Sequence, residues 1–263
     1  MTADRAIVTS TKNPIVQRFR AAAAGDAPDV MAAEGVRLVA EALDAKLRVR
    51  EAAVSPRCTD APLRARLQAA AASFVECSDE VLAALSALET PQGVAVILQR
   101  PTADESALLR GPGAPLVVVA AGIRDPGNLG ALLRTAEAAG SSGVLTMRGG
   151  ADPFRDKAVR GSMGSVFRLP VRHGLDTAAI VAFAKTHRLQ IVVGDGTGKQ
   201  RYTAVDFRRP TLLVVGAEAA GVPDELRAAA DACVHVPLRA PVESLNVAVA
   251  AGVLLYEALR QRS

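Results

Sequence analysis

Three short segments of the 263-residue chain carry polar and charged side chains just after apolar runs. The segments are 125–136, with Asn128, Gly130 and Arg134; 215–223, with Gly216, Glu218 and Gly221; and 236–247, with Pro237, Ser244, Leu245 and Asn246. Glycine lets a backbone approach a ligand closely, and amide, hydroxyl, carboxylate and guanidinium groups can bind one. Loops at the carboxyl ends of parallel strands are the expected place for a small ligand. The segments therefore predict a small-molecule site built from distant parts of the chain.

Each of these side chains also has a purely structural interpretation. Ser244 and Asn246 are short polar residues of the kind that cap helices, and a long apolar helix follows them. Asn128 is likewise a candidate N-cap. Arg134 could be an exposed cation, and Glu218 a solvated carboxylate beyond a strand. The residues alone leave both interpretations open.

The elements that must position these residues alternate between helix and strand. In the first hundred residues, the pattern predicts helices over 13–24, 33–45, 62–71 and 79–87 and strands over 49–54, 74–77 and 93–98. Ser78 is a plausible N-cap for the helix that follows it. Prolines and glycines then crowd residues 100–115 and break both helix and strand. The predicted division is a small domain over 1–100, a linker over 101–115 and a larger domain over 116–263.

The larger domain contains fully apolar runs at 116–121, 144–147, 190–193, 212–215 and 234–237. Continuous apolar strands separated by helices are typical of a parallel sheet covered on both faces, so the predicted fold class is α/β. A terminal helix over 247–259 is apolar around nearly its whole circumference. Such a helix must be covered on all sides, either by its own chain or by a second copy.

The charge distribution suggests a polyanion as partner. The net charge is only +4, but residues 148–172 hold six arginines and lysines against two aspartates. The first twenty residues form a second basic stretch, so the footprint would be split over two domains. Aromatic residues make up 3% of the chain, which favours recognition of RNA by shape, backbone and 2′-hydroxyl over base stacking.

Composition excludes several other classes. No uncharged apolar run is long enough to span a membrane. The N-terminus lacks the charged segment followed by an apolar segment that is typical of a signal peptide. The three separated cysteines indicate a reducing cytoplasm, and the scattered histidines support neither a zinc site nor a hydrolase triad. The loop 194–199 imitates a phosphate loop, but Gln200 stands where Ser or Thr is needed and no helix follows.

Taken together, the three segments resemble the motifs of the SpoU (TrmH-like) family of RNA ribose 2′-O-methyltransferases, in the SPOUT superfamily. The matching patterns are Asn-x-Gly-x-x-x-Arg, Gly-x-Glu-x-x-Gly, and a strand-end proline followed by Ser-Leu-Asn. The front of the chain resembles the L30e-like substrate domain of many members, through residues 10–14, 34–38 and 90–93. The resemblance covers nearly the whole length. It implies a C-terminal deep trefoil knot and, in the first domain, a small α/β fold.

The resemblance also implies the roles of individual residues. S-adenosylmethionine would be the methyl donor, with no metal, and its expected contacts are Gly194, Gly196, Gly216, Glu218, Gly221, Val236, Pro237, Ser244, Leu245 and Asn246. The expected catalytic residues are Arg134, Asn128, Glu218, Ser244 and Asn246. Arg134 would lie at the ribose 2′-hydroxyl. Because a guanidinium keeps its proton above pH 12, we expect it to orient the target and stabilise charge.

The expected partner is structured RNA, most readily ribosomal RNA, with transfer RNA as the alternative for the same chemistry. RNA contacts are predicted at Lys12, Arg18, Arg37, Arg155, Lys157 and Arg160. Family members dimerise through the terminal helix and the first-motif helix, so a cytoplasmic homodimer with sites completed across the interface is expected. The alternative from another class is an RNA-binding protein that has lost catalysis. In such a protein some motif positions should be missing, but the sequence keeps all of them.

Overall fold

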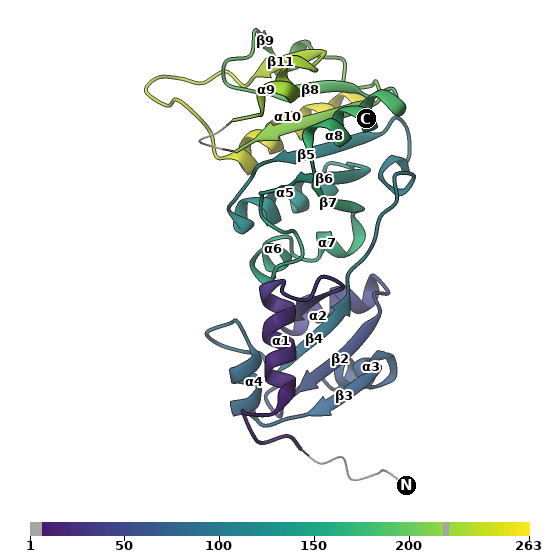
Figure 1. Ribbon diagram of the computed structural model, residues 1–263, viewed down its shortest axis with the longest axis vertical. Helices are drawn as coiled ribbons and strands as arrows, with labels where there is room; N and C mark the ends of the chain where they lie inside the picture. The colour runs from purple at the N-terminus through teal and green to yellow at the C-terminus, as the bar shows by residue number, and fades with distance from the viewer. Residues whose placement is uncertain (1–6, 218–220) are drawn as a thin grey trace. The chain divides into compact units, whose positions relative to one another are not determined.

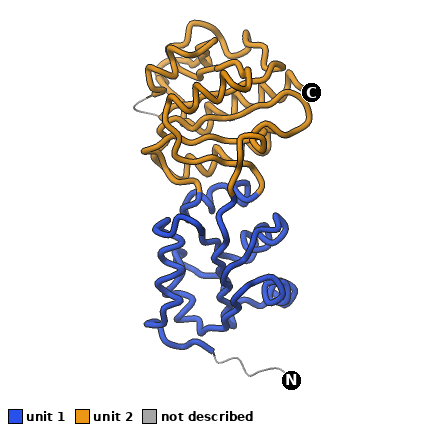
Figure 2. Tube along the Cα trace, turned by 45° about the vertical axis from the view of Figure 1, so that its right-hand side comes forward, with its two compact units in different colours: residues 1–101, 154–167 blue, residues 102–153, 168–263 orange. Residues whose placement is uncertain are grey.

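The computed structural model describes residues 7–217 and 221–263. Figure 2 shows two compact units, which we call the first and the second unit. The first unit comprises Met1–Pro101 together with Phe154–Phe167, and the second comprises Thr102–Pro153 and Arg168–Ser263. The break near Pro101 lies at the start of the expected linker. Residues 154–167 belong to the first unit, although the sequence division placed them in the larger domain.

The first unit is built on a four-stranded sheet with the order β1-β4-β2-β3. Its strands are β1 Val30–Glu34, β2 Val49–Val54, β3 Ser73–Glu76 and β4 Val94–Gln99. Its helices are α1 Pro14–Ala24, α2 Val36–Asp44, α3 Ala61–Ala70, α4 Asp79–Leu85 and α6 Asp156–Gly161, with α7 Ser165–Arg168 at its boundary. Helices α1 and α4 lie side by side (Figure 1). They bury Phe19, Ile15 and Leu82 in the core on one face of the sheet, and α2 and α3 also contact the sheet.

Most elements of this unit follow the sequence pattern, with one correction. The predicted N-cap Ser78 is confirmed, since its hydroxyl accepts a hydrogen bond from the Val81 amide at 3.3 Å. The helix predicted over 33–45 is wrong at its start, because residues 30–34 form strand β1. Pairing with β4 overrides the helical preference of Met-Ala-Ala, and Gly35, with φ +89°, separates β1 from α2.

The second unit contains a seven-stranded, all-parallel sheet with the order β7-β6-β5-β10-β8-β11-β9. Its strands are β5 Leu116–Ala121, β6 Gly143–Met147, β7 Val171–Leu175, β8 Gln190–Gly194, β9 Gln200–Arg201, β10 Thr211–Gly216 and β11 Ala232–His235. The five predicted strands and their parallel arrangement are confirmed. Strands β7 and β9 went unpredicted because they form the sheet edges, where no continuous apolar run is needed.

Helices cover both faces of this sheet. They are α5 Pro126–Ala138, α8 Thr177–Thr186, α9 Asp224–Ala228 and α10 Val247–Arg262, with short 3-10 helices at Ala107–Leu109 and Tyr202–Ala204. Helices α8 and α9 contribute Ile180, Phe183 and Leu226 to the core on one face. On the other face α10 packs closely on β8, because a Cβ on Gly194 would lie 2.7 Å from Leu254 Cδ1. Helix α5 contacts α10.

The strand order brings the three motif segments to one edge. Strands β5, β10, β8 and β11 are neighbours, so their carboxyl ends lie side by side (Figure 1). The first motif follows β5, the second follows β10 and the third follows β11, while the loop 194–199 follows β8. The expected small-molecule site therefore has its scaffold at this edge.

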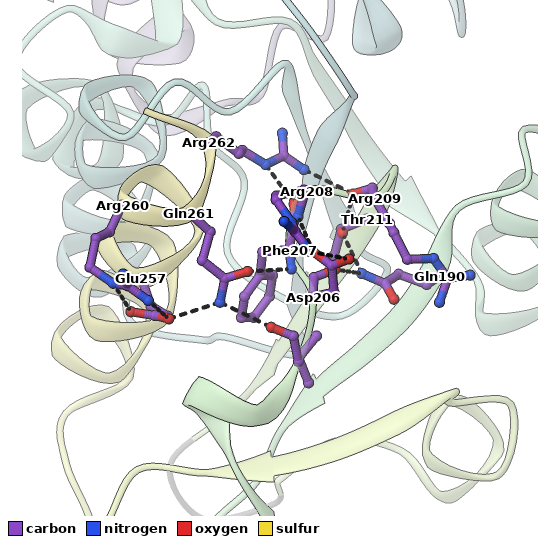
Figure 3. A network of polar contacts seen from close by, with 11 residues as sticks. Gln190, Asp206, Phe207, Arg208, Arg209, Thr211, Glu257, Arg260, Gln261 and Arg262 are labelled. Carbon is purple, nitrogen blue, oxygen red and sulfur yellow. Dashed lines mark hydrogen bonds and ion pairs between the residues drawn. The ribbon is translucent and has the colours of Figure 1, made fainter.

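A polar network fixes the end of α10 to the loop before β10 (Figure 3). Gln261 accepts a hydrogen bond from the Phe207 amide at 2.8 Å and donates to the Val205 carbonyl at 3.0 Å. Arg262 Nε donates to the Phe207 carbonyl at 2.7 Å. Hydrogen bonds from Arg260 and Gln261 lower the pKa of Glu257 to about 2. These contacts hold the C-terminal end of α10 in place. The N-terminal end of the same helix follows the third motif.

Candidate functional site

A cavity of about 380 Å³ opens at the carboxyl ends of β8, β10 and β11. We call it the donor cavity. Its apolar walls are Val215, Val222, Val234, Val236, Leu238, Leu245, Val247, Ala250 and Leu254. Its charged lining residues, among those that the structure describes, are Asp195, Arg227 and Glu243. The arrangement suits a mainly apolar ligand that also carries a few polar groups.

Most of the residues predicted to bind the cofactor line the donor cavity. They are Gly194, Gly196, Gly216, Gly221, Val236, Ser244 and Leu245. Pro237 and Asn246 belong to the same loop but not to the lining. Glu218 lies outside the described residues, so its expected role is carried forward as a proposal. Asp195, Thr197 and Arg227 were missed, although a carboxylate directly after a strand, within a glycine-rich turn, is a signal that could have found the first of them.

Two glycines of the cavity region are required by close backbone contacts. A Cβ on Gly216 would lie 2.3 Å from the Gly221 carbonyl carbon, and one on Gly198 would lie 2.6 Å from the Val234 carbonyl carbon. The loops are also joined by hydrogen bonds, from the Asp195 amide to the Val234 carbonyl at 2.8 Å and between His235 Nδ1 and the Gly198 carbonyl at 2.9 Å. The loops around the cavity are therefore fixed by their own backbone contacts.

A second cavity of about 570 Å³ adjoins the first. It is lined by the segment after β5, including Arg124, Asp125 and Asn128, and it shares Ala217, Gly221 and Val247 with the donor cavity. We call it the acceptor cavity. A molecule held in the donor cavity could thus meet a second molecule approaching from the first-motif side.

A hydrogen bond joins the first and the third motif next to the cavities. Asn246 Nδ2 donates to Asn128 Oδ1 at 3.0 Å, across 118 positions of the chain. Asn246 also caps α10, since its Oδ1 accepts from the Ala248 amide at 2.9 Å. Its cap role is confirmed, whereas Ser244 lies in the loop before the helix. The suggestion that Asn128 is the N-cap of α5 is wrong: Asp125 occupies that position and accepts from the Asn128 amide at 2.8 Å.

Arg134 does not belong to the part of the first motif that lines the acceptor cavity. It is exposed on α5 and lies six residues beyond Asn128, which places it about 120° around the helix. It is absent from the lining of the two cavities formed by the described residues. The described residues of one chain therefore do not place Arg134 at either cavity.

The residues predicted to contact RNA fall into two groups. Lys12, Arg37, Arg155 and Lys157 are exposed. Arg18 pairs with Glu51 at 2.6 Å, and Arg160 pairs with Asp156 and, at 3.5 Å, with Glu34. Burial raises the pKa of both Glu34 and Asp156. The ion pairs of Arg18 and Arg160 compensate part of their charge, so these two are the weaker candidates for contact with a polyanion.

Comparison with known proteins decides the family. A profile described as the SpoU rRNA methylase family matches residues 115–256, more than half of the chain. The chain belongs to the SpoU rRNA methylase family. The family and the α/β fold predicted from the motifs are confirmed, as is the methyltransferase class, while the trefoil knot stays a prediction. A second profile, described as an MRM3-like substrate binding domain, matches residues 26–96.

Relatives of this SpoU protein cover its whole length. An uncharacterized tRNA/rRNA methyltransferase of Synechocystis sp. is 33% identical over all of this chain and 96% of its own. The 23S rRNA (guanosine(2553)-2′-O)-methyltransferase RlmP of Bacillus subtilis is 34% identical over 85% of this chain and 86% of its own.

Solved structures agree with this assignment. The SpoU methyltransferase AviRb of Streptomyces viridochromogenes, in complex with AdoMet, has a TM-score of 0.87 at 27% identity, covering 95% of this chain and 98% of that one. An AdoMet-bound rRNA methyltransferase of Sinorhizobium meliloti has a TM-score of 0.86 at 32% identity, covering 98% of both chains.

Within the described ranges, no group of histidine, cysteine, aspartate and glutamate residues is arranged to hold a metal ion. The same ranges contain no helix with the length and apolar character that crossing a bilayer requires.

The two functions of Asn246 can be separated by substitution. Asn246→Ser keeps an oxygen that can cap α10 but is too short to reach Asn128, whereas Asn246→Ala loses both contacts. We expect Asn246→Ala to lower the free energy of unfolding by about 1 kcal/mol and Asn246→Ser to leave it nearly unchanged. Both should slow methyl transfer by about tenfold, the equivalent of one lost hydrogen bond. Denaturant unfolding and single-turnover rates check this, and full activity of Asn246→Ser would show that the bond to Asn128 is dispensable.

Proposed function

We propose that this protein transfers a methyl group from S-adenosylmethionine to a ribose 2′-oxygen in ribosomal RNA. The main support is the meeting of the three motif segments at one sheet edge, tied by the bond between Asn246 and Asn128. The names of the relatives, 23S rRNA 2′-O-methyltransferases, support the choice of ribosomal RNA and of the 2′-oxygen. The AdoMet-bound structures of similar chains support the choice of donor.

The donor cavity fits S-adenosylmethionine on its own chemistry. Close backbone contacts at Gly216 hold the turn of the second motif against the end of β10, where it lines the cavity. Asp195 and Glu243 supply negative charge for a cationic ligand, and the valines and leucines supply an apolar wall. We propose that Gly194, Gly196, Gly216, Gly221, Val236 and Leu245 hold the donor, largely through backbone groups. Pro237 shapes the same loop, and Ser244, Asn246 and Glu218 complete the site.

The chain's part in the reaction is mainly to position the reactants. The donor's sulfonium supplies an already activated methyl group, so the protein must align the acceptor and stabilise charge at the 2′-oxygen. We propose that Arg134 does this as a permanent cation that orients the target phosphate and ribose. Asn128 and Asn246 link the acceptor cavity to the donor cavity.

In the proposed homodimer, Arg134 of one protomer reaches the cavities of the other. Arg134 is exposed and lies outside the lining that the described residues of one chain provide. Helix α10, which contacts α5, exposes Val249 and Tyr256 at 54% and 53%, one above the other on the same face. Such an apolar stripe on a long helix is suited to a second copy of the chain. In that arrangement Arg134 of one protomer acts at the cavities of its partner.

The first unit is proposed to bind the RNA substrate. It contains the region that matches the substrate binding profile, and it exposes Lys12, Arg37, Arg155 and Lys157. Residues 154–167 join this unit, so Arg155 and Lys157 contribute to the same RNA-binding domain as residues 1–100. We retain Arg18 and Arg160 as weaker contacts because each is engaged in ion pairs.

RNA binding should lose salt dependence when the exposed arginines are neutralised. The double variant Arg37→Gln with Arg155→Gln removes two cations that have no carboxylate partner among the described residues. The slope of log affinity against log salt should fall by roughly 0.7–0.9 per residue, because fewer counterions are released. Filter binding of ribosomal RNA over a salt series measures the slope. Arg66→Gln is the matched control, since Arg66 pairs with Asp44 at 2.5 Å and should leave the slope unchanged.

The activity itself is tested with labelled donor. The protein is incubated with methyl-labelled S-adenosylmethionine and separate ribosomal and transfer RNA fractions, which are then digested to nucleosides. We expect label in 2′-O-methylated ribose of ribosomal RNA, and Arg134→Ala should abolish it. Label in a base would contradict the proposed reaction, and label confined to transfer RNA would contradict the proposed substrate.

A further inference from the structure

One arginine in the donor cavity has no place in the family motifs. Arg227 lies on the short helix α9 and lines the cavity together with Asp195 and Thr197, from the loop after β8. Asp195 is 10% exposed, and its carboxylate pairs with Arg227 Nη1. Thr197 donates to Asp195 Oδ1 from its amide at 2.8 Å and from its hydroxyl at 2.7 Å. An ion pair joining two distant elements is therefore part of the cavity wall.

The carboxylate of Asp195 is held in its charged form. Burial alone would raise the pKa of Asp195, but hydrogen bonds from Thr197 and the charge of Arg227 outweigh it and lower that pKa. Arg227 Nη1 also lies 3.4 Å from Thr197 Oγ1. These contacts hold Arg227 Nη1 in place and so set the orientation of the whole guanidinium group.

The opposite edge of the guanidinium faces the second motif. A Cβ built on Gly221 would lie 3.7 Å from Arg227 Nη2, so that nitrogen is directed toward the turn at Gly221. Nη2 has no hydrogen-bond partner among the described residues. An oriented arginine with unused donors is suited to bind a carboxylate.

Charge matching identifies the group it would bind. Arg227 is the only cation among the described residues that line the cavity. The proposed donor carries one anionic group, the α-carboxylate of its methionyl part, beside two cationic groups. We propose that Arg227, oriented by Asp195 and Thr197, binds the α-carboxylate of the donor and selects for ligands that carry it. This assignment rests on the proposed function of the cavity.

The experiment compares two donors that differ only in the carboxylate. Calorimetry measures the affinity of the full-length protein for S-adenosylmethionine and for decarboxylated S-adenosylmethionine. The unsubstituted protein should prefer the carboxylate form by about ten- to a hundredfold, the range for a charge-assisted hydrogen bond. In Arg227→Met the preference should fall to near one, with little change for the decarboxylated ligand.

Further variants keep the result interpretable. Arg227→Gln retains donors for Thr197 and Asp195 without the charge, and it should lose the same preference even if Arg227→Met folds poorly. Arg208→Met is the control, since it removes a similar arginine–aspartate pair, with Asp206 at 2.7 Å, outside the donor cavity. It should keep the preference.

The possible failures have separate meanings. If both Arg227 variants lose affinity equally for the two ligands while the unsubstituted protein discriminates, Arg227 is only a structural ion pair and the inference is overturned. A protein that binds both ligands equally before substitution overturns it as well. If the unsubstituted protein binds neither ligand, the proposed function of the cavity fails, and the inference fails with it.

Discussion

Arg134→Ala is expected to slow methyl transfer by about a hundredfold or more while donor affinity stays within a factor of two. Arg134 lies outside the lining that the described residues provide to the donor cavity, so its removal should leave that cavity intact. Its proposed role is to stabilise charge at the acceptor oxygen, where loss of one oriented donor is costly. Single-turnover rates and calorimetry with S-adenosylmethionine measure the two quantities separately. Loss of donor affinity equal to the loss of rate would show that Arg134 belongs to the donor site.

The homodimer adds a stricter form of this test. Mixing an Arg134→Ala chain with an Asn246→Ala chain produces dimers in which one of two sites has both residues. With random exchange, about a quarter of the activity of the unsubstituted protein should return. Light scattering must show a dimer at the working concentration. A monomer, or no recovery of activity after exchange, would contradict the proposal that Arg134 acts on the partner's cavities.

Gly216→Ala is expected to destabilise the protein and to abolish donor binding. The added Cβ would lie 2.3 Å from the Gly221 carbonyl carbon, 2.4 Å from its oxygen and 2.5 Å from the Val222 amide nitrogen. All three are backbone atoms, so no side chain can move aside and the turn of the second motif must shift. We expect the free energy of unfolding to fall by about 3 kcal/mol, at the upper end for overpacking. Denaturant unfolding and calorimetry with the donor measure the two effects.

Gly196→Ala is the matched control for this substitution. It makes the same chemical change in another loop of the donor cavity, but its Cβ would meet nothing within 4 Å. The free energy of unfolding should therefore stay unchanged or rise by about 0.4–1 kcal/mol, through the lower entropy of the unfolded chain. Equal destabilisation by both substitutions would mean that the close approach at Gly216 is not the cause.

Local patterns in the sequence were sufficient for the central sheet and the family. Strands β5, β6, β8 and β10 are almost fully buried, so each is a largely apolar run, and such runs are visible in the sequence alone. Strand β11 is only partly buried, and its run was predicted at 234–237, whereas the strand is Ala232–His235. The motif residues follow these strands directly, so predicting the strands also placed the motifs at one edge. The cap at Ser78 is equally local, because a cap joins residues three positions apart.

Elements whose conformation depends on a distant partner were predicted less well. Residues 30–34 form β1 because β4 pairs with them, not because of their own preference. The sequence pattern indicated Asn128 as the candidate cap of α5, but the structure has Asp125 there, with Pro126 in the first turn where its missing amide costs nothing. Residues 154–167 join the first unit through contacts far away in the chain.

The site divides in the same way. Residue type and position identified the Asn246 cap, and the resemblance to the family motifs implied the glycines of the cavity. Only the tertiary structure joined Asn246 to Asn128 and Arg227 to Asp195, and only it placed Arg134 outside both described cavities. The reason is physical: hydrophobic periodicity and capping act within a few residues, whereas these contacts form only after the strand order has brought distant loops to one edge.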